Sequence, residues 1–450
     1  MRVAVVGAGV AGLAAALDLS QAGADVVVLE GSSRVGGKLL VGSVGDVEVD
    51  LGAEAMLARR PEGVDLARRV GLGEQLAHPE TLTAAIWTRG ALRPMPPTVL
   101  GVPSDLDALA ESGIVAERPR AHAEPVPSHD VSVAEFLTPR VGREVVDRLV
   151  EPLLGGVYAG HADRLSLQAA APQIAALGSD PLSGAARSRE TPTATGPVFA
   201  GLVGGMGRLP EAIVSAGRFA VRTDAVVRAV ERSGDGWAIH HGPTVDVTTE
   251  HVDAVVLATP APATARLLGD VAPEAAFALA GVEYASMAVI TLLLDGPVDA
   301  DVSGFLVPPV DGTAIKGATF SSRKWGWLAE RVGGSAGEGR SVVRASIGRA
   351  GETGMLLGPD ADLVEAATTD LRAALGTLPP VLESHVQRWG GALPQYDVGH
   401  RDLVERVHLA VTEVPGLEVC GAAYEGVGIP AVIASAQAAA RRVLAGSDLG

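Results

Sequence analysis

The first thirty residues carry the pattern that most constrains the fold of this chain. A β-branched run at Arg2–Val6 predicts a short strand, and the glycine-rich run Gly7–Gly12 follows it directly. An Ala- and Leu-rich stretch to about Gln21 predicts a helix, and Asp25–Leu29 predicts a second strand that ends at Glu30. Strand, glycine turn, helix, strand and acid in this order predict a βαβ unit with parallel strands, and hence an α/β fold.

The glycine turn is suited to the phosphates of a dinucleotide. Gly7 permits the tight turn, Gly9 lets the backbone approach a pyrophosphate, and Gly12 allows the helix to pack against the strand. Val10 and Ala11 open the helix, whose N-terminal N–H groups and positive dipole end would face the phosphates. We therefore predict a nucleotide-binding site at this turn.

The segment after the second predicted strand indicates which dinucleotide is bound. Glu30 would accept hydrogen bonds from ribose hydroxyls and disfavour a 2′-phosphate. Gly36 and Gly37 form a second glycine pair, which lets backbone amides reach the pyrophosphate from the other side. Together with Arg34 and Lys38, this pair resembles the R-x-G-G-R/K element of the flavin amine oxidase and phytoene desaturase superfamily. The resemblance implies FAD as the cofactor.

Three further segments resemble flavin-contacting parts of that superfamily. Residues 50–55 resemble a D-x-G-A stretch that runs beside the isoalloxazine ring, and residues 253–260 resemble a strand that ends in A-T-P. At residues 416–421 a predicted strand precedes a Gly-rich turn and an Ala-rich helix from Ile429 to about Ala445. The N-terminus of that helix would face the flavin edge where negative charge accumulates on reduction. The further residues that the resemblance places at the cofactor are Gly52, Ala53, Glu54, Ala55, Val227, Trp389, Gly421, Val427, Gly428 and Ile429.

A longer motif narrows the resemblance to one family. Residues 151–166 read EPLLGGVYAGHADRLS, which resembles the E-P-L/F-x-x-G-V/I-Y-A-G-x-x-x-x-L-S signature of the oxygen-dependent coproporphyrinogen III and protoporphyrinogen oxidases. Residues 202–210, 304–308, 319–325 and 388–396 also resemble segments of that family. The resemblance therefore covers nearly the whole chain, whereas amine oxidases and desaturases share only the flavin elements.

This family resemblance implies three domains in a chain of 450 residues. We expect a discontinuous Rossmann-like FAD-binding domain formed by residues 1–75, 196–265 and 384–450. A substrate-binding domain with a mixed sheet would be formed by residues 76–103 and 266–383. A helical domain would occupy residues 104–195.

The resemblance also implies a reaction. Six electrons would be removed from a porphyrinogen in three flavin cycles, with O2 as acceptor and H2O2 as by-product. FAD would carry the redox step while the protein positions the substrate. No Ser/His/Asp or paired-carboxylate constellation requires a general base, and no His/Cys cluster has the spacing of a metal site. We therefore assign no catalytic side chain and no metal.

The propionates of such a substrate require cations. Arg60 is the first candidate and Arg59 the second, because in the family a basic residue at about this place faces a substrate carboxylate. The guanidinium fork can donate two parallel hydrogen bonds to a carboxylate. Arg323, Lys324 and Arg344 are weaker candidates of the same kind.

Charge and composition exclude several other classes. The formal net charge is −17 and no long Lys/Arg run occurs, which argues against a nucleic-acid-binding protein. The longest uncharged stretches, about 15 to 17 residues, are short of the roughly 20 that a spanning helix needs, so no transmembrane segment is expected. The single cysteine, Cys420, cannot form an internal disulfide and fits a reducing cytoplasm.

The acidic balance favours the more polar substrate, coproporphyrinogen III, which has four carboxylates against the two of protoporphyrinogen IX. The short, Arg-rich sequence with few aromatic residues also resembles the coproporphyrinogen III oxidases of Gram-positive bacteria, with protoporphyrinogen IX oxidase as the alternative. A flavin amine oxidase ranks lower, because 3% aromatic residues leave little for an aromatic amine-binding cage. A non-catalytic escort protein of the prenyl-GTPase type also ranks lower, since such proteins lack an intact double glycine and C-terminal flavin turn, and this chain keeps both. A ferrochelatase, which would take up the product, is a candidate protein partner.

Overall fold

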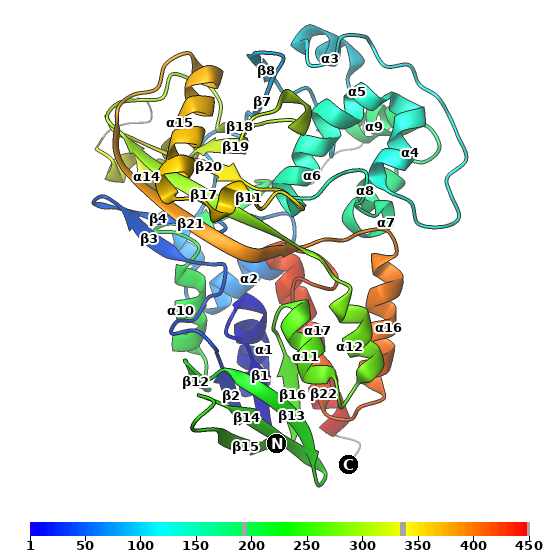
Figure 1. Cartoon of the computed structure of the whole chain (residues 1–450), viewed down its shortest axis with the longest axis vertical. Helices are drawn as coiled ribbons and strands as arrows, with labels where there is room; N and C mark the ends of the chain where they lie inside the picture. Colours follow the sequence, from blue (N-terminus) through cyan, green and yellow to red (C-terminus); the bar gives the residue numbers. More distant parts are fainter. Residues whose placement is uncertain (191–195, 334–338, 448–450) are drawn as a thin grey trace.

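The computed structural model describes residues 1–190, 196–333 and 339–447. Figure 1 shows an elongated molecule in which a parallel sheet and its helices form one half, and a large mixed sheet and a group of helices form the other. Both termini lie at the same end of the molecule, below the parallel sheet. Residues 191–195, the end of the expected helical domain, lie outside the described residues.

A five-stranded parallel sheet contains the N-terminal βαβ unit. Helices cover both faces of this sheet, as expected for strands that are short apolar runs. Alternate residues of each strand enter the apolar clusters on its two sides. Helices α1 (Val10–Gln21), α10 (Arg208–Ala216) and α17 (Ile429–Ser447) pack on one face, and α11 (Ala261–Leu268), α12 (Pro273–Ala280) and α16 (His400–Thr412) on the other. In spatial order the strands are β12 (Ala220–Arg222), β2 (Asp25–Leu29), β1 (Arg2–Val6), β16 (Ala254–Leu257) and β22 (Leu417–Val419).

A three-stranded antiparallel sheet covers part of the second face. It consists of β13 (Val227–Ser233), β14 (Gly236–His241) and β15 (Thr248–Val252). The indole of Trp237 on β14 is fully buried in the apolar cluster with Val255 and Leu257 of the parallel sheet. This packing holds the antiparallel sheet against the end of the parallel sheet where the chain begins (Figure 1).

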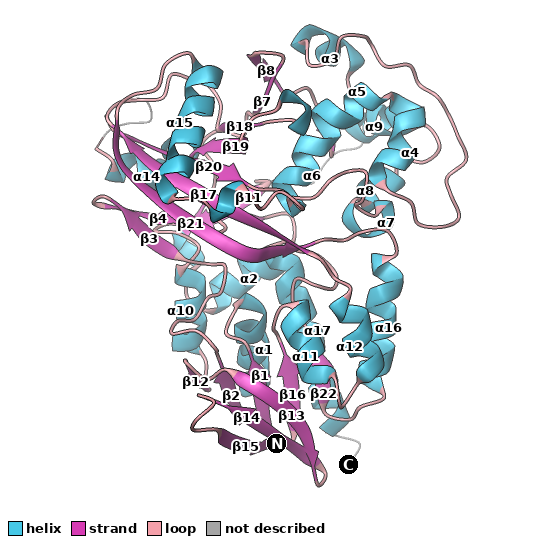
Figure 2. Cartoon of the chain, viewed as in Figure 1, coloured by secondary structure: helices cyan, strands magenta, loops and turns pink. Residues whose placement is uncertain are grey.

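The other half is built on a seven-stranded mixed sheet (Figure 2). Its neighbours pair antiparallel except β18 and β7. Helix α15 (Asp360–Leu375) packs on one face with Ala288 and Ile290 of β17, so Met287 and Val289 lie on the opposite face. The order is β21 (Val381–Pro394), β17 (Tyr284–Leu294), β20 (Ser341–Ile347), β19 (Ile315–Phe320), β18 (Gly304–Leu306), β7 (Ala85–Thr88) and β8 (Ala91–Pro94).

A group of helices with its own apolar cluster packs beside this sheet (Figure 2). A π-helical turn at Val146–Val150 leads into α6 (Glu151–Tyr158), which ends at Ala159 in the left-handed region with φ 50°. Leu306 of β18 packs against this cluster, so the helices are fixed to the sheet. The remaining helices are α3 (Leu106–Ser112), α4 (Val133–Val141), α5 (Arg143–Val145), α7 (Leu167–Ala170), α8 (Pro172–Ala175) and α9 (Pro181–Glu190).

Short elements connect the two halves. A small sheet joins β11 (Phe199–Leu202) to β5 (Met56–Leu57) and β6 (Leu76–Ala77), and a hairpin is formed by β3 (Val41–Val44) and β4 (Val47–Asp50). The remaining short elements are α2 (Pro61–Arg69), β9 (Thr98–Val99), β10 (Val102–Pro103), α13 (Ser321–Lys324) and α14 (Gly326–Arg331). No helix among the described residues is both long and apolar enough to cross a bilayer.

Two of the expected domain limits fall inside a strand or a helix, and so divide an element that belongs to one half of the molecule. The limit at residue 384 cuts β21, which pairs with β17 along almost its whole length and so belongs to the mixed sheet. The limit at residue 265 cuts α11 and assigns α12 to the substrate domain, whereas both helices pack on the parallel sheet. Both differences arise from pairing and packing between distant segments, which the local pattern of residues does not report.

Candidate functional site

The glycine turn contains two kinds of glycine. At Gly12 a Cβ would lie 1.8 Å from the carbonyl oxygen of Gly7, so the packing of α1 itself requires glycine there. Gly7 has a φ of 103° and donates its N–H to Leu29 at 2.8 Å, which closes the turn between the strands. Gly9 has an ordinary φ of −70°, and no heavy atom lies within 4 Å of the position of its Cβ.

The space beside Gly9 is therefore open at the N-terminus of α1. Val10 and Ala11 form the first turn of this helix, and the N-cap residue Gly9 has no side chain to bind the free N–H groups. Unpaired N–H groups at a helix start, with open space before them, form an arrangement that binds phosphate. The turn thus fits a pyrophosphate, as its sequence predicts.

The second glycine pair lies against the first turn. Gly36 donates its N–H to Ala8 O at 2.8 Å, and a Cβ on Gly37 would lie 3.3 Å from the Cα of Gly9. Both residues have positive φ, 100° and 56°. The side chain of Lys38 is exposed at the end of this turn. The two glycine turns therefore border the same open space, although residues 7 and 37 are far apart along the chain.

Glu30 lies at the end of β2 beside these turns. Its Oε2 accepts the N–H of Ala8 at 2.7 Å, and its Oε1 accepts the N–H and the hydroxyl of Ser32, both at 2.8 Å. Val226, which contacts Gly31, has an exposed side chain, whereas the side chain of Val227 is buried in the core. Val227 can therefore reach a ligand only through its backbone, and Val226 offers the apolar surface next to the acid.

The D-x-G-A stretch lies beside the second glycine turn. A Cβ on Gly52 would lie 1.9 Å from the carbonyl oxygen of Lys38 and 3.3 Å from the indole of Trp389. Trp389 donates its Nε1–H to Leu51 O at 3.0 Å, and Ala53 is exposed. The structure thus places residues 36–38, 52–53 and 389 next to one another.

Glu54 is the centre of a buried ion network. Its carboxylate accepts hydrogen bonds from Lys324 at 2.7 Å and Arg344 at 2.6 Å, and from the hydroxyl of Ser321 at 3.1 Å. These two cations hold the pKa of Glu54 at about 2 despite its burial. Arg344 also donates to Gly52 O, so the network fixes the D-x-G-A stretch to the mixed sheet.

The network involves two of the three weaker candidates for a propionate contact. Lys324 and Arg344 are paired with Glu54, so neither is a free partner for a substrate carboxylate. Glu54 likewise directs its side chain to these cations, and Ala55 is the half-buried residue that follows it. Arg323 pairs with the exposed Asp301 at 3.2 Å. The sequence missed this network because its members are brought together only by the fold.

The two arginines after β5 also differ. Arg60 is the N-cap residue of α2 and pairs with Glu62 at 2.7 Å. Arg59 is exposed and forms no hydrogen bond or ion pair with the part of the chain that the structure describes. The structure therefore favours Arg59, the second candidate, as the free cation at this place.

Asp50, the first residue of the D-x-G-A stretch, has a second role. Its carboxylate accepts the N–H groups of Met206 at 3.0 Å and Gly207 at 3.3 Å, and burial raises its pKa to about 7. It thereby joins this stretch to the turn at residues 203–207. Its place in the motif was visible in the sequence, but its partners were not.

The C-terminal segment returns to the first glycine turn. A Cβ on Gly421 would lie 4.0 Å from the Cβ of Ala11, so this residue contacts the start of α1. Val427 and Gly428 precede Ile429, the first residue of α17, and Val432 donates its N–H to Gly428 O at 3.0 Å. The N-termini of α1 and α17 therefore lie at the same end of the parallel sheet.

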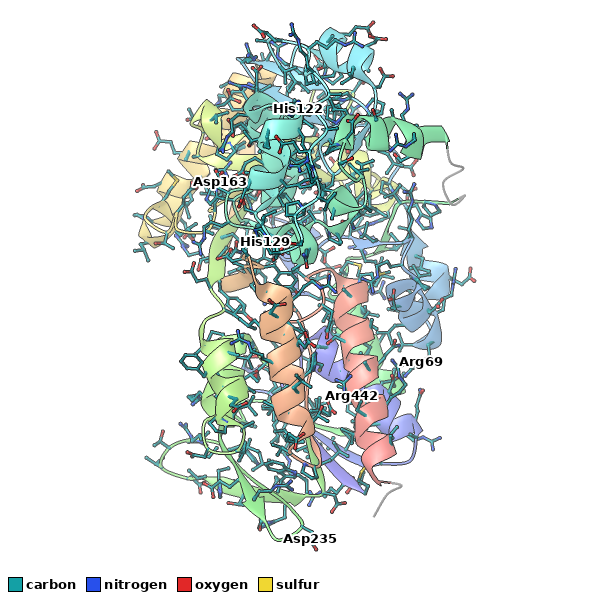
Figure 3. The ribbon with its side chains drawn as sticks, turned by 90° about the vertical axis from the view of Figure 1, so that its right-hand side faces the viewer. Arg69, His122, His129, Asp163, Asp235 and Arg442 are labelled. Carbon is teal, nitrogen blue, oxygen red and sulfur yellow. The ribbon has the colours of Figure 1, made fainter. Side chains whose placement is uncertain are left out.

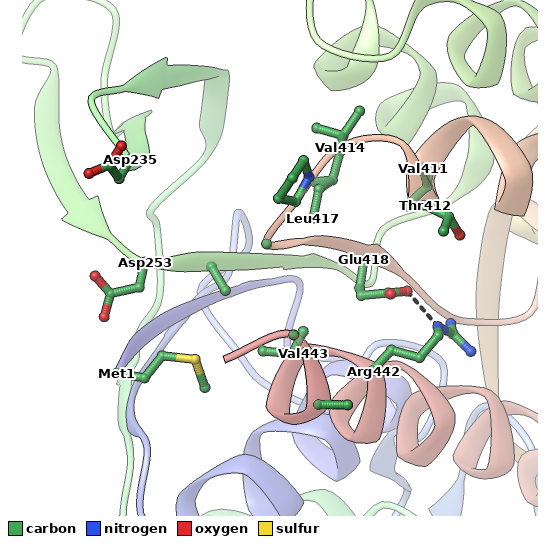
Figure 4. A pocket seen from close by; sticks show the side chains of 15 residues that line it. Met1, Asp235, Asp253, Val411, Thr412, Val414, Leu417, Glu418, Arg442 and Val443 are labelled. Atoms are coloured by element: carbon green, nitrogen blue, oxygen red, sulfur yellow. Dashed lines mark hydrogen bonds and ion pairs between the residues drawn. The ribbon is translucent and has the colours of Figure 1, made fainter. Parts of the chain in front are cut away.

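A cavity of about 670 Å³ lies at the opposite end of this sheet (Figure 4). Met1, Asp253 and Gly416, which line it, precede β1, β16 and β22, whereas the glycine turn follows β1. Glu418 and Arg442 pair at its edge at 2.9 Å. Figure 3 shows Arg442 on α17, in the half of the molecule away from the helical group. This cavity is separate from the glycine turns, and no cluster of metal-binding side chains occurs among the residues described.

Comparisons with known proteins agree with this geometry. The family model of the flavin containing amine oxidoreductases matches residues 10–444. A coproporphyrinogen III oxidase of Mycobacterium leprae is 36% identical, covering 96% of each chain, and the one of Bacillus subtilis is 28% identical, covering 97% of each. A crystal structure of a protein assigned as a protoporphyrinogen oxidase, from Exiguobacterium, superposes with a TM-score of 0.85 at 29% identity over 98% of both chains. The chain belongs to the family of flavin-containing amine oxidoreductases.

Proposed function

We propose that this oxidoreductase uses FAD to oxidise coproporphyrinogen III to coproporphyrin III. The observation that carries the proposal is the 36% identity, over 96% of both chains, to the Mycobacterium leprae coproporphyrinogen III oxidase. Similarity of this extent includes the helices and the mixed sheet that surround the substrate side of the molecule, as well as the flavin turns. It therefore supports a shared substrate as well as a shared cofactor.

The two glycine turns would hold the FAD pyrophosphate between them. Gly9 and Gly37 border the open space at the start of α1, and Glu30 lies next to this space. The carboxylate of Glu30 would accept hydrogen bonds from the ribose hydroxyls. Gly52 and Ala53 would run beside the isoalloxazine ring, and the start of α17 would face its electron-rich edge. These assignments rest on the arrangement of backbone groups, which a flavin recognises through hydrogen bonds.

Bound FAD would supply the redox chemistry. In each of three rounds it would accept two electrons from the porphyrinogen and pass them to O2, which leaves as H2O2. The part of the side chains is to orient the macrocycle and to exclude water from the flavin. Trp389 and Met287 lie on the mixed-sheet face next to the D-x-G-A stretch and would contact the apolar ring of the substrate. Arg59 would bind one propionate, since its guanidinium is free and exposed.

Protoporphyrinogen IX is the second candidate substrate. The specific observation in its favour is the similarity to the Exiguobacterium structure, which covers 98% of both chains. Its two vinyl groups would need apolar contacts where coproporphyrinogen presents propionates. An amine substrate ranks lower, since the Mycobacterium leprae and Mycobacterium bovis relatives, 36% and 35% identical to this chain, are coproporphyrinogen III oxidases.

Porphyrin fluorescence tests the proposal. Purified protein loaded with FAD is mixed in air with coproporphyrinogen III or protoporphyrinogen IX at equal concentrations, and autoxidation is subtracted with a flavin-free sample. We expect the faster rise with coproporphyrinogen III. A clear preference for protoporphyrinogen IX would instead assign the chain to the second substrate, and oxidation of neither would contradict a porphyrinogen oxidase function.

Two further features belong to the same proposal. A cytoplasmic location is supported by the single cysteine, Cys420, which is buried and free. A ferrochelatase that takes up the product is the protein partner we propose, because coproporphyrin III can next receive iron. Co-purification of the two proteins with and without coproporphyrin III would test that contact.

A further inference from the structure

Lys316 is a buried cation without an anionic partner. Its side chain is only 4% exposed, and its Nζ reaches the carbonyl oxygen of Gly155 at 3.3 Å and the Sδ of Met287 at 4.0 Å. No carboxylate lies within ion-pair distance of it in the described parts of the chain. An ammonium group has three N–H donors, so at least one remains without an acceptor. Burying such a charge is costly unless a partner is supplied.

The position of Lys316 in the sheet brings this charge to the substrate side. It is the extra residue of a β-bulge in β19, between Ile315, which pairs with Ile347, and Gly317, which pairs with Ser346. Bulges redirect single side chains and are frequent beside active sites. The contact with Met287 shows that Lys316 lies on the face of the sheet opposite α15.

A row of contacts connects this face to the flavin side. Met287 on β17 is paired with Trp389 on β21, and the indole of Trp389 lies against Gly52 of the D-x-G-A stretch. On its other side Lys316 reaches Gly155 in the last turn of α6. Lys316 therefore lies between the helical group and the strand residues nearest the flavin-contacting stretch.

The other charged groups around Lys316 do not neutralise it. Arg349 and Glu352, after β20, pair with each other at 3.6 Å, and Arg349 also donates to Val307 O. On the helical side the carboxylate of Glu151 is hydrogen-bonded to His161 at 2.9 Å and accepts the N–H of Ala162 at 2.6 Å. One positive charge, that of Lys316, is thus left over among these groups.

We propose that Lys316 binds a carboxylate of the substrate, in the place now taken by the Met287 thioether. This assignment rests on the proposed function and deepens it, because it gives the substrate a second cation besides Arg59. Met287 is only half-buried, and the flexible side chain of methionine adapts easily to an incoming group. A propionate would complete the hydrogen bonds of the ammonium, and a vinyl group would not, so Lys316 would favour the more carboxylated porphyrinogen.

The state of the free enzyme supports this role. Burial lowers the pKa of Lys316 to about 7, and nearby Arg349 lowers it further than Glu352 raises it. A bound carboxylate favours the protonated amine, so binding would be weaker above about pH 7, where the free lysine has lost its proton. The His161–Glu151 pair is the other titrating group nearby, but its contacts are with Ala350 and Ala162 rather than with Lys316.

Steady-state kinetics with two forms of one substrate test the proposal. The FAD-loaded wild type and Lys316→Met, which keeps the length of the side chain without its charge, are assayed with coproporphyrinogen III and with its tetramethyl ester. We expect the KM for the free acid to rise at least tenfold in Lys316→Met, while the KM for the ester, the flavin content and kcat stay unchanged. Lys316→Arg should retain most of the affinity, and Arg331→Met, which removes an exposed cation, serves as the matched control.

Equal changes in the KM of acid and ester, or no change in either, would overturn the role of Lys316. Oxidation of neither substrate by the wild type would instead contradict the proposed function, so the two failures are distinguishable. If Lys316→Met does not fold, the pH profile of the wild type decides the question. We expect the KM of the free acid, but not that of the ester, to rise above about pH 7, and an identical pH dependence for both would overturn the proposal.

Discussion

The proposed flavin site and the proposed substrate site of this molecule are built from different chemical groups. The proposed pyrophosphate site uses backbone and bare glycines: Gly9 and Gly37 leave space, and the N-terminus of α1 supplies the polarity. The face of the mixed sheet above it uses buried charges: Glu54 pairs with two cations, whereas Lys316 has no anionic partner among the described residues. A ligand that every member of a fold shares can be bound by backbone groups, whereas a particular substrate needs particular side chains.

The largest expected effect separates two glycines of the same turn. Gly12→Leu should prevent folding, because its Cβ would lie 1.8 Å from a backbone oxygen that cannot move away. Gly9→Leu should fold, because its Cβ meets nothing within 4 Å, yet it should lose nearly all of its flavin. Circular dichroism and flavin absorbance measure the two effects. A Gly9→Leu protein with full flavin content would break the assignment of the backbone site.

The next effect concerns the buried ion network. Glu54→Gln leaves Lys324 and Arg344 without their carboxylate, and removal of one partner of a buried ion pair costs about 3–5 kcal/mol. The free energy of unfolding in urea should fall by about this amount. Asp301→Asn, which removes the fully exposed partner of Arg323, is the control and should not change Tm measurably. Equal stabilities of the two variants would show that the network does not hold the D-x-G-A stretch.

The two buried acids of the D-x-G-A stretch predict opposite pH dependences. Glu54 has a depressed pKa of about 2, so its contribution is complete above about pH 4.5 and is lost as the pH falls toward 2. Asp50 has a raised pKa of about 7, so the folded state holds a proton that the unfolded state loses, and stability falls as the pH rises from about 4 to 7. The loss is at most about 4 kcal/mol, at 1.36 kcal/mol per pKa unit.

Urea unfolding at several pH values checks this sign. Asp50→Asn cannot ionise, so its stability should stay constant between pH 4 and 7 apart from changes that both proteins share. A wild type that instead gains stability over this range relative to Asp50→Asn would mean that Asp50 is ionised in the folded protein.

The smallest expected effect distinguishes the two arginines after β5. Arg59→Ala should weaken the binding of coproporphyrinogen III by roughly 1.5–3 kcal/mol, the range of a hydrogen bond to a charged group. The loss would be measured as a higher KM, with the flavin content unchanged. Arg60→Ala should have little effect on KM, because Arg60 already pairs with Glu62. The opposite result would return the propionate contact to Arg60.

The sequence alone predicted well the strands and helices that border the proposed backbone site. The strands Arg2–Val6 and Asp25–Leu29 and the helix ending at Gln21 are confirmed at the predicted residues, and the C-terminal helix begins at Ile429 and ends two residues beyond the predicted Ala445. The sequence signals for these elements are local, because a β-branched run, a glycine and an acid that mark their limits lie within a few residues of one another. The mixed sheet and the separate group of helices confirm the predicted α/β architecture.

The charged groups could not be predicted in the same way. Glu54 meets Lys324 and Arg344 across 270 and 290 residues, and no local pattern reports which cation of several finds the acid. The same applies to β21, whose polar residues give no sign of its long pairing with β17, and to the ion pair with Glu62 that distinguishes Arg60 from Arg59. Lys316 carried a signal, a lysine within an apolar strand, but its lack of a partner is visible only in three dimensions.

An anaerobic mixing experiment tests the central claim most directly. FAD-loaded protein is mixed with coproporphyrinogen III or protoporphyrinogen IX in the absence of O2, and the loss of the oxidised-flavin absorbance is followed in a stopped-flow instrument. We expect rapid bleaching by coproporphyrinogen III, slower bleaching by protoporphyrinogen IX, and recovery of the absorbance when air is admitted. Flavin that stays oxidised with coproporphyrinogen III would contradict the proposed function.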